Sequence, residues 1–118
     1  MKFRYEELHV STQTESFINQ IYSISSTFPN SERFGLISQI QRASTSVLLN
    51  IAEGSARNSK ADFARFLTIA LGSLVETHAI LKIAVSRKYL KQKQFDDLQP
   101  IIEDIWIKLC ALRRSQQK

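Results

Sequence analysis

The longest helical pattern in the chain lies in residues 59–87, which read SKADFARFLTIALGSLVETHAILKIAVSR. Apolar residues recur there at spacings of three and four, the period of an amphipathic α-helix. They are Phe63, Phe66, Leu67, Ala70, Leu74, Leu81 and Val85. Ser59 followed by Asp62 resembles a capping box, with Asp in place of the usual Glu. Gly72 and Ser73 remove bulk from one face, which suits close approach by a neighbouring helix. We therefore expect a helix over about residues 60–87.

The segment before it repeats the same period over about residues 32–57. Its apolar face consists of Ile37, Ile40, Ser44, Val47, Leu48 and Ile51. Asn30 or Ser31 can cap this helix, because both side chains accept hydrogen bonds from first-turn amides. Gly54 stands where the pattern ends. It is either a C-cap or a point of close packing, and the sequence leaves both open.

The outer segments predict two more helices. One covers about residues 6–26 and ends near Phe28-Pro29, because a residue before proline is pushed out of the α region. Its stripe is Val10, Thr14, Phe17, Ile21, Ile24 and Phe28. The other covers about residues 91–114, with Phe95, Leu98, Ile102, Ile105, Trp106, Leu109 and Leu112 on one arc. Pro100 is expected to kink this helix or to place its start later.

Four long helices joined by short links predict an all-α fold, an antiparallel up-down four-helix bundle. The chain of 118 residues is long enough for one domain, and we expect a single domain over residues 1–118. Only three glycines and two prolines occur, too few for a turn-rich β-sandwich or barrel.

The composition also excludes several kinds of site. A single cysteine, Cys110, rules out an internal disulfide framework and a cysteine-based zinc site. The histidines His9 and His78 lie far apart, no Glu-x-x-His motif occurs, and no glycine-rich phosphate loop is present. We therefore expect no enzyme activity, no catalytic residues, no metal and no cofactor. No run of 18 apolar residues and no secretory leader pattern occur, which favours a cytoplasmic protein without a membrane span.

Positive charge is concentrated in the second half of the chain. The net charge is +5, yet residues 54–93 alone carry +6, because they hold eight basic residues and only Asp62 and Glu76 as acids. Such a concentration permits a polyanion partner. The candidate nucleic-acid-binding residues are Arg57, Lys60, Arg65, Arg87, Lys88, Lys91 and Lys93. The alternative is that these charges only keep the protein soluble.

A strip of hydrogen-bonding side chains runs along the second predicted helix. At 100° per residue they fall within about 80°, opposite the apolar face. We call them the polar strip: Gln39, Arg42, Ser46, Asn50, Glu53 and Arg57. Glu53 and Arg57 are spaced for an i,i+4 ion pair. The strip is either a solvated face or a polar interface network. Arginine without lysine favours the interface, where guanidinium groups meet carboxylates or phosphates.

Residues 28–76 carry a dense motif that extends beyond helical periodicity. It consists of Phe28-Pro29, Glu32-Arg33-Phe34-Gly35-Leu36, Gln39-Ile40, Arg42-Ala43, Ser46, Asn50-Ile51-Ala52-Glu53-Gly54, Arg57, Ser59, Phe63, Phe66-Leu67, Ala70, Gly72-Ser73-Leu74 and Glu76. The motif resembles the four-helix-bundle protein family first noticed in intervening sequences of bacterial 23S ribosomal RNA genes. The first and last helices match only in pattern. The chain departs from the family's usual residues at Ser11-Thr12-Gln13, at His78 and at Pro100.

The resemblance implies a four-helix bundle that assembles as a ring, with a homopentamer favoured, and no enzymatic activity. The family is similar to accessory proteins of diversity-generating retroelements, which are basic pentameric barrels thought to hold nucleic acid and a reverse transcriptase. The resemblance also implies that Arg42, Asn50, Glu53 and Arg57 pair within or across protomers. From the polar strip we expect Asn50, Glu53 and Arg57 to be mostly buried in the assembled ring. We expect a non-enzymatic oligomeric scaffold that binds nucleic acid. The alternative is a protein-protein adaptor or structural ring.

Overall fold

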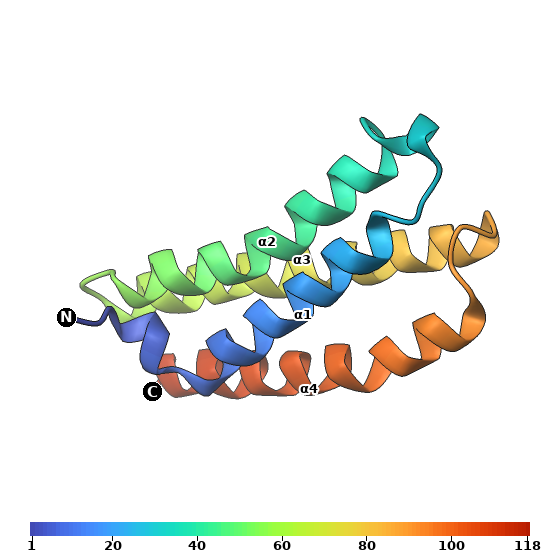
Figure 1. The fold of residues 1–118 in the computed structure, drawn as a ribbon. Helices are drawn as coiled ribbons and strands as arrows, with labels where there is room; N and C mark the ends of the chain where they lie inside the picture. Colours follow the sequence, from blue (N-terminus) through green and yellow to red (C-terminus); the bar gives the residue numbers. More distant parts are fainter.

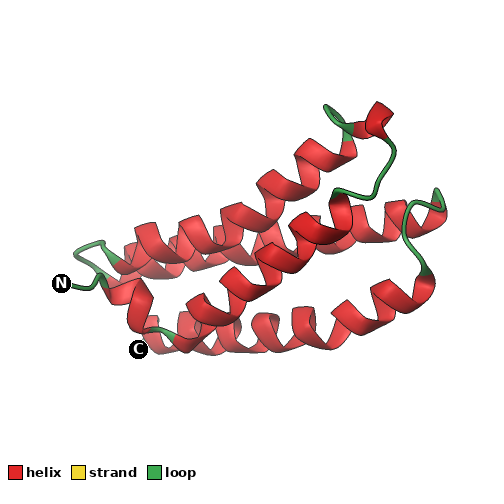
Figure 2. Cartoon of the chain, in the orientation of Figure 1, coloured by secondary structure: helices red, strands yellow, loops and turns green.

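The structure, a computed structural model of residues 1–118, consists of helices and short connections with no strand (Figure 2). The four α-helices are α1 (His9–Ser25), α2 (Leu36–Ser55), α3 (Lys60–Ser86) and α4 (Gln92–Gln116). Short 3-10 turns cover Arg4–Glu7 and Asn30–Glu32. The predicted all-α fold with four helices is therefore confirmed.

The helices alternate in direction and form an elongated bundle of 44 × 24 × 22 Å (Figure 1). Helix α3 packs between α2 and α4, and α1 packs against α2 and α4 on the other side. Both chain termini and the α2–α3 link lie at one end of the bundle, which we call the terminal end (Figure 1). The α1–α2 and α3–α4 connections lie at the other, the loop end (Figure 1).

The core is one cluster of 22 buried side chains contributed mainly by the predicted stripes. Its fully buried members include Phe17, Ile40, Leu67, Leu74 and Ile105. Thr14 is also fully buried, and its hydroxyl donates to the Val10 carbonyl oxygen at 2.7 Å. This bond shows how a serine- and threonine-rich helix can face a core, since the buried hydroxyl finds a partner on its own backbone.

Some side chains on the predicted stripes lie at the edge of the core. Leu48, Val85 and Leu112 are only half-buried. Trp106 is 41% exposed, so it lines the surface of α4 and does not anchor the interior. These residues occupy the borders of their helical arcs, where a side chain is shared between core and solvent.

Two helices begin later than periodicity predicts. Helix α1 begins at His9, after the Arg4–Glu7 turn. Helix α2 begins at Leu36, because Gly35 is non-helical at φ −111° and ψ −113°. A carboxylate oxygen of Glu32 accepts from the Leu36 amide at 3.2 Å and caps the new start. At α3 the predicted cap is confirmed, with the Ser59 hydroxyl accepting from the Asp62 amide at 3.1 Å.

Pro100 lies inside α4, which runs without interruption from Gln92 to Gln116. The expectation that proline places the start of the helix later is therefore wrong. Pro100 is exposed on the solvent side, where its ring does not meet a neighbouring helix. Phe95 and Leu98, which precede it, are buried in the core.

Helix α3 is long and apolar enough to cross a membrane by length and composition alone, with a mean hydropathy of 1.4 over an 18-residue window. Half of that window is buried inside the bundle, as in the core helix of a soluble protein. The expected absence of a membrane span therefore stays a prediction.

Three side chains that all contact one another join helices α1 and α4: Gln13 on α1, and Asp104 and Lys108 on α4. Asp104 accepts from the Gln13 amide at 2.6 Å and pairs with Lys108 at 2.9 Å. The Lys108 ammonium also donates to the side-chain amide oxygen (Oε1) of Gln13 at 3.1 Å. The hydrogen bonds from Lys108 and then Gln13 lower the pKa of Asp104 below its ordinary range.

This contact predicts a pH-dependent contribution to stability. A carboxyl group with a lowered folded-state pKa stabilises the fold above its unfolded pKa of about 4, and that contribution is lost as pH falls through the folded-state pKa. Asp104→Asn is therefore expected to lower the urea midpoint at pH 6, with the difference from the parent chain shrinking towards pH 2.5. Asp97→Asn, in an exposed pair with Lys93, serves as the control and is expected to change stability little. A pH-independent difference for Asp104→Asn would contradict the assignment.

Candidate nucleic-acid interface

Five of the six polar-strip residues lie on the outer face of α2, whereas Arg57 lies in the α2–α3 link, because the helix ends at Ser55, two residues before the predicted end. Gln39, Arg42, Glu53 and Arg57 are exposed, whereas Ser46 and Asn50 are half-buried. Helix α2 therefore presents its five strip side chains away from its buried face, as the helical projection predicts.

Only the middle of the polar strip forms a hydrogen-bonded network within the chain. The Asn50 amide nitrogen donates to the carbonyl oxygen of Ser46 at 2.8 Å and to its hydroxyl at 3.0 Å. The Ser46 and Ser73 hydroxyl groups lie 2.9 Å apart and join α2 to α3. Glu53 and Arg57 do not form the predicted ion pair. The Arg57 guanidinium lies instead 4.8 Å from the centre of the Phe66 ring.

An open hollow of about 430 Å³ follows the polar strip between α2 and α3. Leu49 lies within it and is 60% exposed, and Glu76 enters from α3. The side chains of Arg42, Glu53 and Glu76 form no hydrogen bond or ion pair in the single chain, although both signs of charge are present. The hollow thus combines unpaired charges with an exposed leucine.

The basic residues predicted as one nucleic-acid surface are separated by the length of α3. Its 27 residues span about 40 Å at 1.5 Å per residue. Three of the candidates lie at the terminal end and four at the loop end, so the structure does not bring them into one patch. The terminal-end group is Arg57, Lys60 and Arg65, and the loop-end group is Arg87, Lys88, Lys91 and Lys93.

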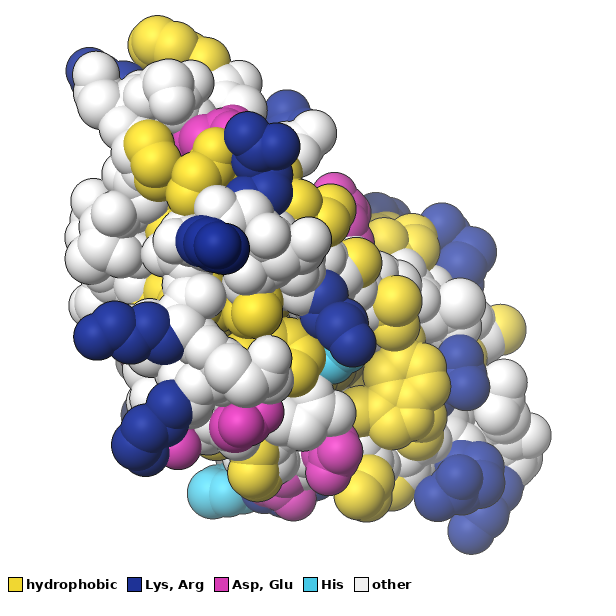
Figure 3. Space-filling model, turned by 90° about the vertical axis from the view of Figure 1, so that its right-hand side faces the viewer, with side chains coloured by type: hydrophobic (Ala, Val, Ile, Leu, Met, Phe, Trp, Pro, Cys, Tyr) yellow, Lys and Arg dark blue, Asp and Glu magenta, His cyan; other side chains and the backbone are white.

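Two of the four loop-end cations, Arg87 and Lys93, already have partners. The Arg87 guanidinium donates to the Tyr89 hydroxyl at 3.1 Å, and that hydroxyl donates to Glu32 at 3.0 Å. The hydrogen bond with Tyr89 raises the pKa of Arg87 above its ordinary value. Lys93 pairs with Asp97 at 3.4 Å. Figure 3 looks onto this end and shows Lys and Arg side chains scattered among apolar and acidic ones.

The terminal end gains cations that sequence analysis missed. Arg4 lies with its guanidinium carbon 5.0 Å from the centre of the Phe63 ring. Arg113, near the end of α4, donates to the Thr68 hydroxyl at 3.2 Å. Both residues are distant in sequence from the basic segment, and no local motif connects them to it. Only the antiparallel order of the helices, which brings both termini beside the α2–α3 link, could have suggested them (Figure 1).

Gly54 sets the packing beneath the terminal-end cations. A Cβ atom there would lie 2.6 Å from Phe66 Cβ and 2.9 Å from Phe63 Cδ1. Gly54 belongs to the last turn of α2, and no glycine in the chain has a positive φ. Of the two roles left open by the sequence, the structure therefore selects close packing.

The remaining titratable candidates form ordinary contacts. The His78 imidazole shares a 2.8 Å hydrogen bond with Gln99 and meets the Phe95 ring edge-on at 5.2 Å. Cys110 is half-buried beside the core. No group of three His, Cys, Asp or Glu side chains comes together to hold a metal ion.

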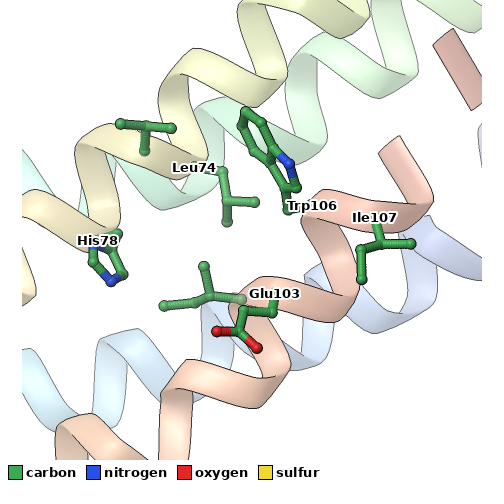
Figure 4. Close-up of a pocket in the computed structure, with 7 residues that line it drawn as sticks. Leu74, His78, Glu103, Trp106 and Ile107 are labelled. Atoms are coloured by element: carbon green, nitrogen blue, oxygen red, sulfur yellow. The ribbon is translucent and has the colours of Figure 1, made fainter. Parts of the chain in front are cut away.

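An apolar groove of about 300 Å³ lies between α3 and α4. Leu74 and His78 from α3 face Glu103 and Trp106 from α4 across it (Figure 4). Val75, Ile102 and Ile107 complete the lining. The groove offers mainly apolar contact area, and its two titratable side chains, His78 and Glu103, each share a hydrogen bond with Gln99.

Comparison with known proteins identifies the family. The sequence profile of the 23S rRNA-intervening sequence proteins matches residues 6–110. The chain belongs to this family. The match covers most of all four helices of the 23S rRNA-intervening sequence protein fold, so it extends well beyond the motif in residues 28–76.

A solved structure supports the same fold. It is the crystal structure, at 1.70 Å resolution, of a protein with unknown function from the S23 ribosomal protein family of Bacteroides thetaiotaomicron VPI-5482. The two chains are 27% identical, with a TM-score of 0.81 over 88% of this chain and 97% of that one. Comparison with curated proteins gave no match. Neither the 23S rRNA-intervening sequence protein family description nor that of the solved relative names an enzymatic activity.

Proposed function

We propose that this family member is a non-enzymatic, cytoplasmic scaffold that assembles with copies of itself and binds nucleic acid through its basic surface. The observation that carries the proposal is the gathering of Arg4, Arg57, Lys60, Arg65 and Arg113 at the terminal end. Assembly would repeat this group of charges and strengthen the field that attracts a polyanion.

The exposed face of α3 supports self-association. Ile69, Val75 and Ile83 are 43%, 53% and 46% exposed along it. Gly72 lies between them, and a Cβ there would meet nothing within 4 Å. The small residue therefore leaves room for another helix that the single chain does not supply. A second copy is a suitable occupant, since large exposed apolar faces are uncommon on monomers.

The polar strip beside this face supports the same arrangement. Arg42 on one copy and Glu53 or Glu76 on the next carry opposite charges without partners in their own chains. Ion pairs across protomers would give both the arginine and the glutamate a partner. The family resemblance favours a pentameric ring for this assembly. In such a ring Glu53→Ala would leave a guanidinium buried and unpaired, at a cost of several kcal/mol. In a dissociated chain, where Glu53 is exposed, the change is expected to stay within about 0.5 kcal/mol.

Titration of a fluorescent oligonucleotide tests the proposed nucleic-acid binding. The parent chain is expected to bind at 50 mM salt and to lose about tenfold or more in affinity at 200 mM, because binding releases counterions from phosphates. Sequence preference is expected to be weak, since contacts to phosphate position a protein without reading bases. Absence of binding at 50 mM salt, or tight binding that ignores salt, would contradict the proposal.

The apolar groove between α3 and α4 favours a second candidate, a protein-protein adaptor. Trp106 and Ile107 are 41% and 63% exposed there, and aromatic residues are enriched at protein interfaces. An adaptor explains the basic charges as a means of solubility. It would be the surviving account if the oligonucleotide does not bind.

A further inference from the structure

We propose that the phosphates of the nucleic-acid backbone bind an arginine–phenylalanine cluster at the terminal end, consisting of Arg4, Arg57, Arg65, Phe63 and Phe66. This inference rests on the proposed function and specifies its binding site. It also predicts that the loop-end cations contribute little, although sequence analysis gave both groups equal weight.

The two rings hold the three guanidinium groups in place. Phe66 lies 4.8 Å from the guanidinium carbon of Arg57 and 4.6 Å from that of Arg65, and Phe63 lies 5.0 Å from that of Arg4. Such distances are typical of cation–π contacts. Phe63 and Phe66 are only 2% and 6% exposed, so surrounding core atoms fix the rings. All three arginines are exposed. The rings therefore form a rigid base beneath solvent-facing cations.

Local sequence builds this arrangement from three separate elements. Phe63 and Phe66 are three residues apart on α3 and thus share a face. Gly54 on α2 lets Phe63 and Phe66 approach, because a Cβ atom there would collide with the Phe63 ring and with the Cβ atom of Phe66. Arg57 follows in the α2–α3 link, and Arg4 arrives from the N-terminal 3-10 turn.

The guanidinium groups have unused hydrogen-bond donors. Arg4 and Arg57 have no carboxylate partner, and the Arg65–Asp62 contact is exposed and long at 3.8 Å. An aromatic ring contacts the face of a guanidinium, while a phosphate binds the N–H groups along its edge. Three neighbouring cations, of which only Arg65 has a carboxylate nearby, are also expected to attract an anion. At the loop end, by contrast, Arg87 already donates a hydrogen bond to Tyr89, and Lys93 already forms an ion pair with Asp97.

Backbone recognition fits the cluster better than recognition of bases or of an acidic peptide. The buried rings have too little free surface to stack on bases, which removes the main source of single-strand affinity beyond charge. The hollow beside the polar strip and the apolar groove between α3 and α4 include no cluster residue. An acidic peptide bound at the cluster would therefore find neither recess for a neighbouring apolar side chain. The repeated phosphates of a nucleic-acid backbone need neither a ring surface for stacking nor an apolar recess.

Two matched triple variants test the site with a labelled 20-nucleotide duplex. The cluster variant carries Arg4→Gln, Arg57→Gln and Arg65→Gln, and the control carries Lys88→Gln, Lys91→Gln and Lys93→Gln. Both lose three positive charges. The cluster variant is expected to lose at least tenfold in affinity at 50 mM salt, and its salt slope should fall by about 2 to 3, near 0.9 per lost phosphate contact. The control is expected to lose twofold or less.

A third variant and a spectroscopic measurement show whether weaker binding comes from loss of the site or from misfolding of the variant. Arg57→Lys with Arg65→Lys keeps the charge but loses the planar contact with the ring, and is expected to bind several-fold more weakly than the parent chain. In the unaltered protein, NMR signals of the arginine Nε–H groups in the cluster should shift when duplex is added, whereas that of Arg87 should not.

The outcomes distinguish this inference from the proposed function. Equal losses for the two triple variants, with the parent chain binding, would overturn the cluster but leave nucleic-acid binding intact. No binding by the parent chain would overturn both. Displacement of the duplex by polyglutamate at equal charge concentration would indicate an acidic protein partner and would also overturn the cluster as a nucleic-acid site.

Discussion

Gly54→Ala is expected to lower the free energy of unfolding by about 2 kcal/mol, although alanine is by itself the better helix former by about 1 kcal/mol. The added Cβ would lie 2.6 Å from Phe66 Cβ, an atom attached directly to the α3 backbone. No rotation of Phe66 moves that atom away, so α2 and α3 must separate. Urea unfolding followed by circular dichroism measures the change.

Gly72→Ala is the matched control for this prediction. It makes the same chemical change in α3, but its Cβ would meet no atom within 4 Å. At a protein concentration low enough to keep the chain monomeric, it is expected to raise stability by about 0.5–1 kcal/mol. A rise for both variants would show that α2 and α3 do not depend on close contact at Gly54.

How much of the fold can be predicted from the sequence depends on how far apart in the chain the interacting residues lie. Apolar periodicity located all four helices, because it reports which face each helix buries. The start of α2 was predicted four residues early because Gly35 breaks the helix at a point that periodicity does not detect. The role of Gly54 stayed open until the position of Phe63 and Phe66 on another helix was known.

The candidate site was predicted less completely for the same reason. Projection onto a helix placed the polar strip on one outer face, as observed for the five residues that lie on α2. It also suggested the Glu53–Arg57 pair, but α2 ends at Ser55, so Arg57 leaves the helical spacing and contacts Phe66 on α3. Counting charge along the chain grouped Arg57 with Arg87, even though α3 holds them at opposite ends. Arg4 joins the cluster through tertiary packing alone.

Gly72→Arg is expected to convert an oligomer into a monomer of 13.5 kDa, with association weakened at least 100-fold. The open space around Gly72 lets an arginine side chain extend into solvent, so the bundle itself should stay folded. In an assembled protein the same side chain would meet Ile69, Val75 or their counterparts on the next copy. At such a contact the long side chain would hold the next copy away, and burying its charge among apolar side chains would cost several kcal/mol.

Sedimentation of Gly72→Arg beside Asn19→Arg measures this effect. Asn19 is exposed on α1, the helix that does not pack against α3, so the control adds the same charge on another side of the bundle. A monomeric parent chain at micromolar concentration, or an oligomeric Gly72→Arg variant, would contradict assembly through this face. Oligonucleotide binding by the dissociated variant links the two proposals. If each protomer contributes one arginine–phenylalanine cluster to a shared strand, the monomer should bind far more weakly than the ring even though it carries one additional positive charge, because the linked sites no longer act together.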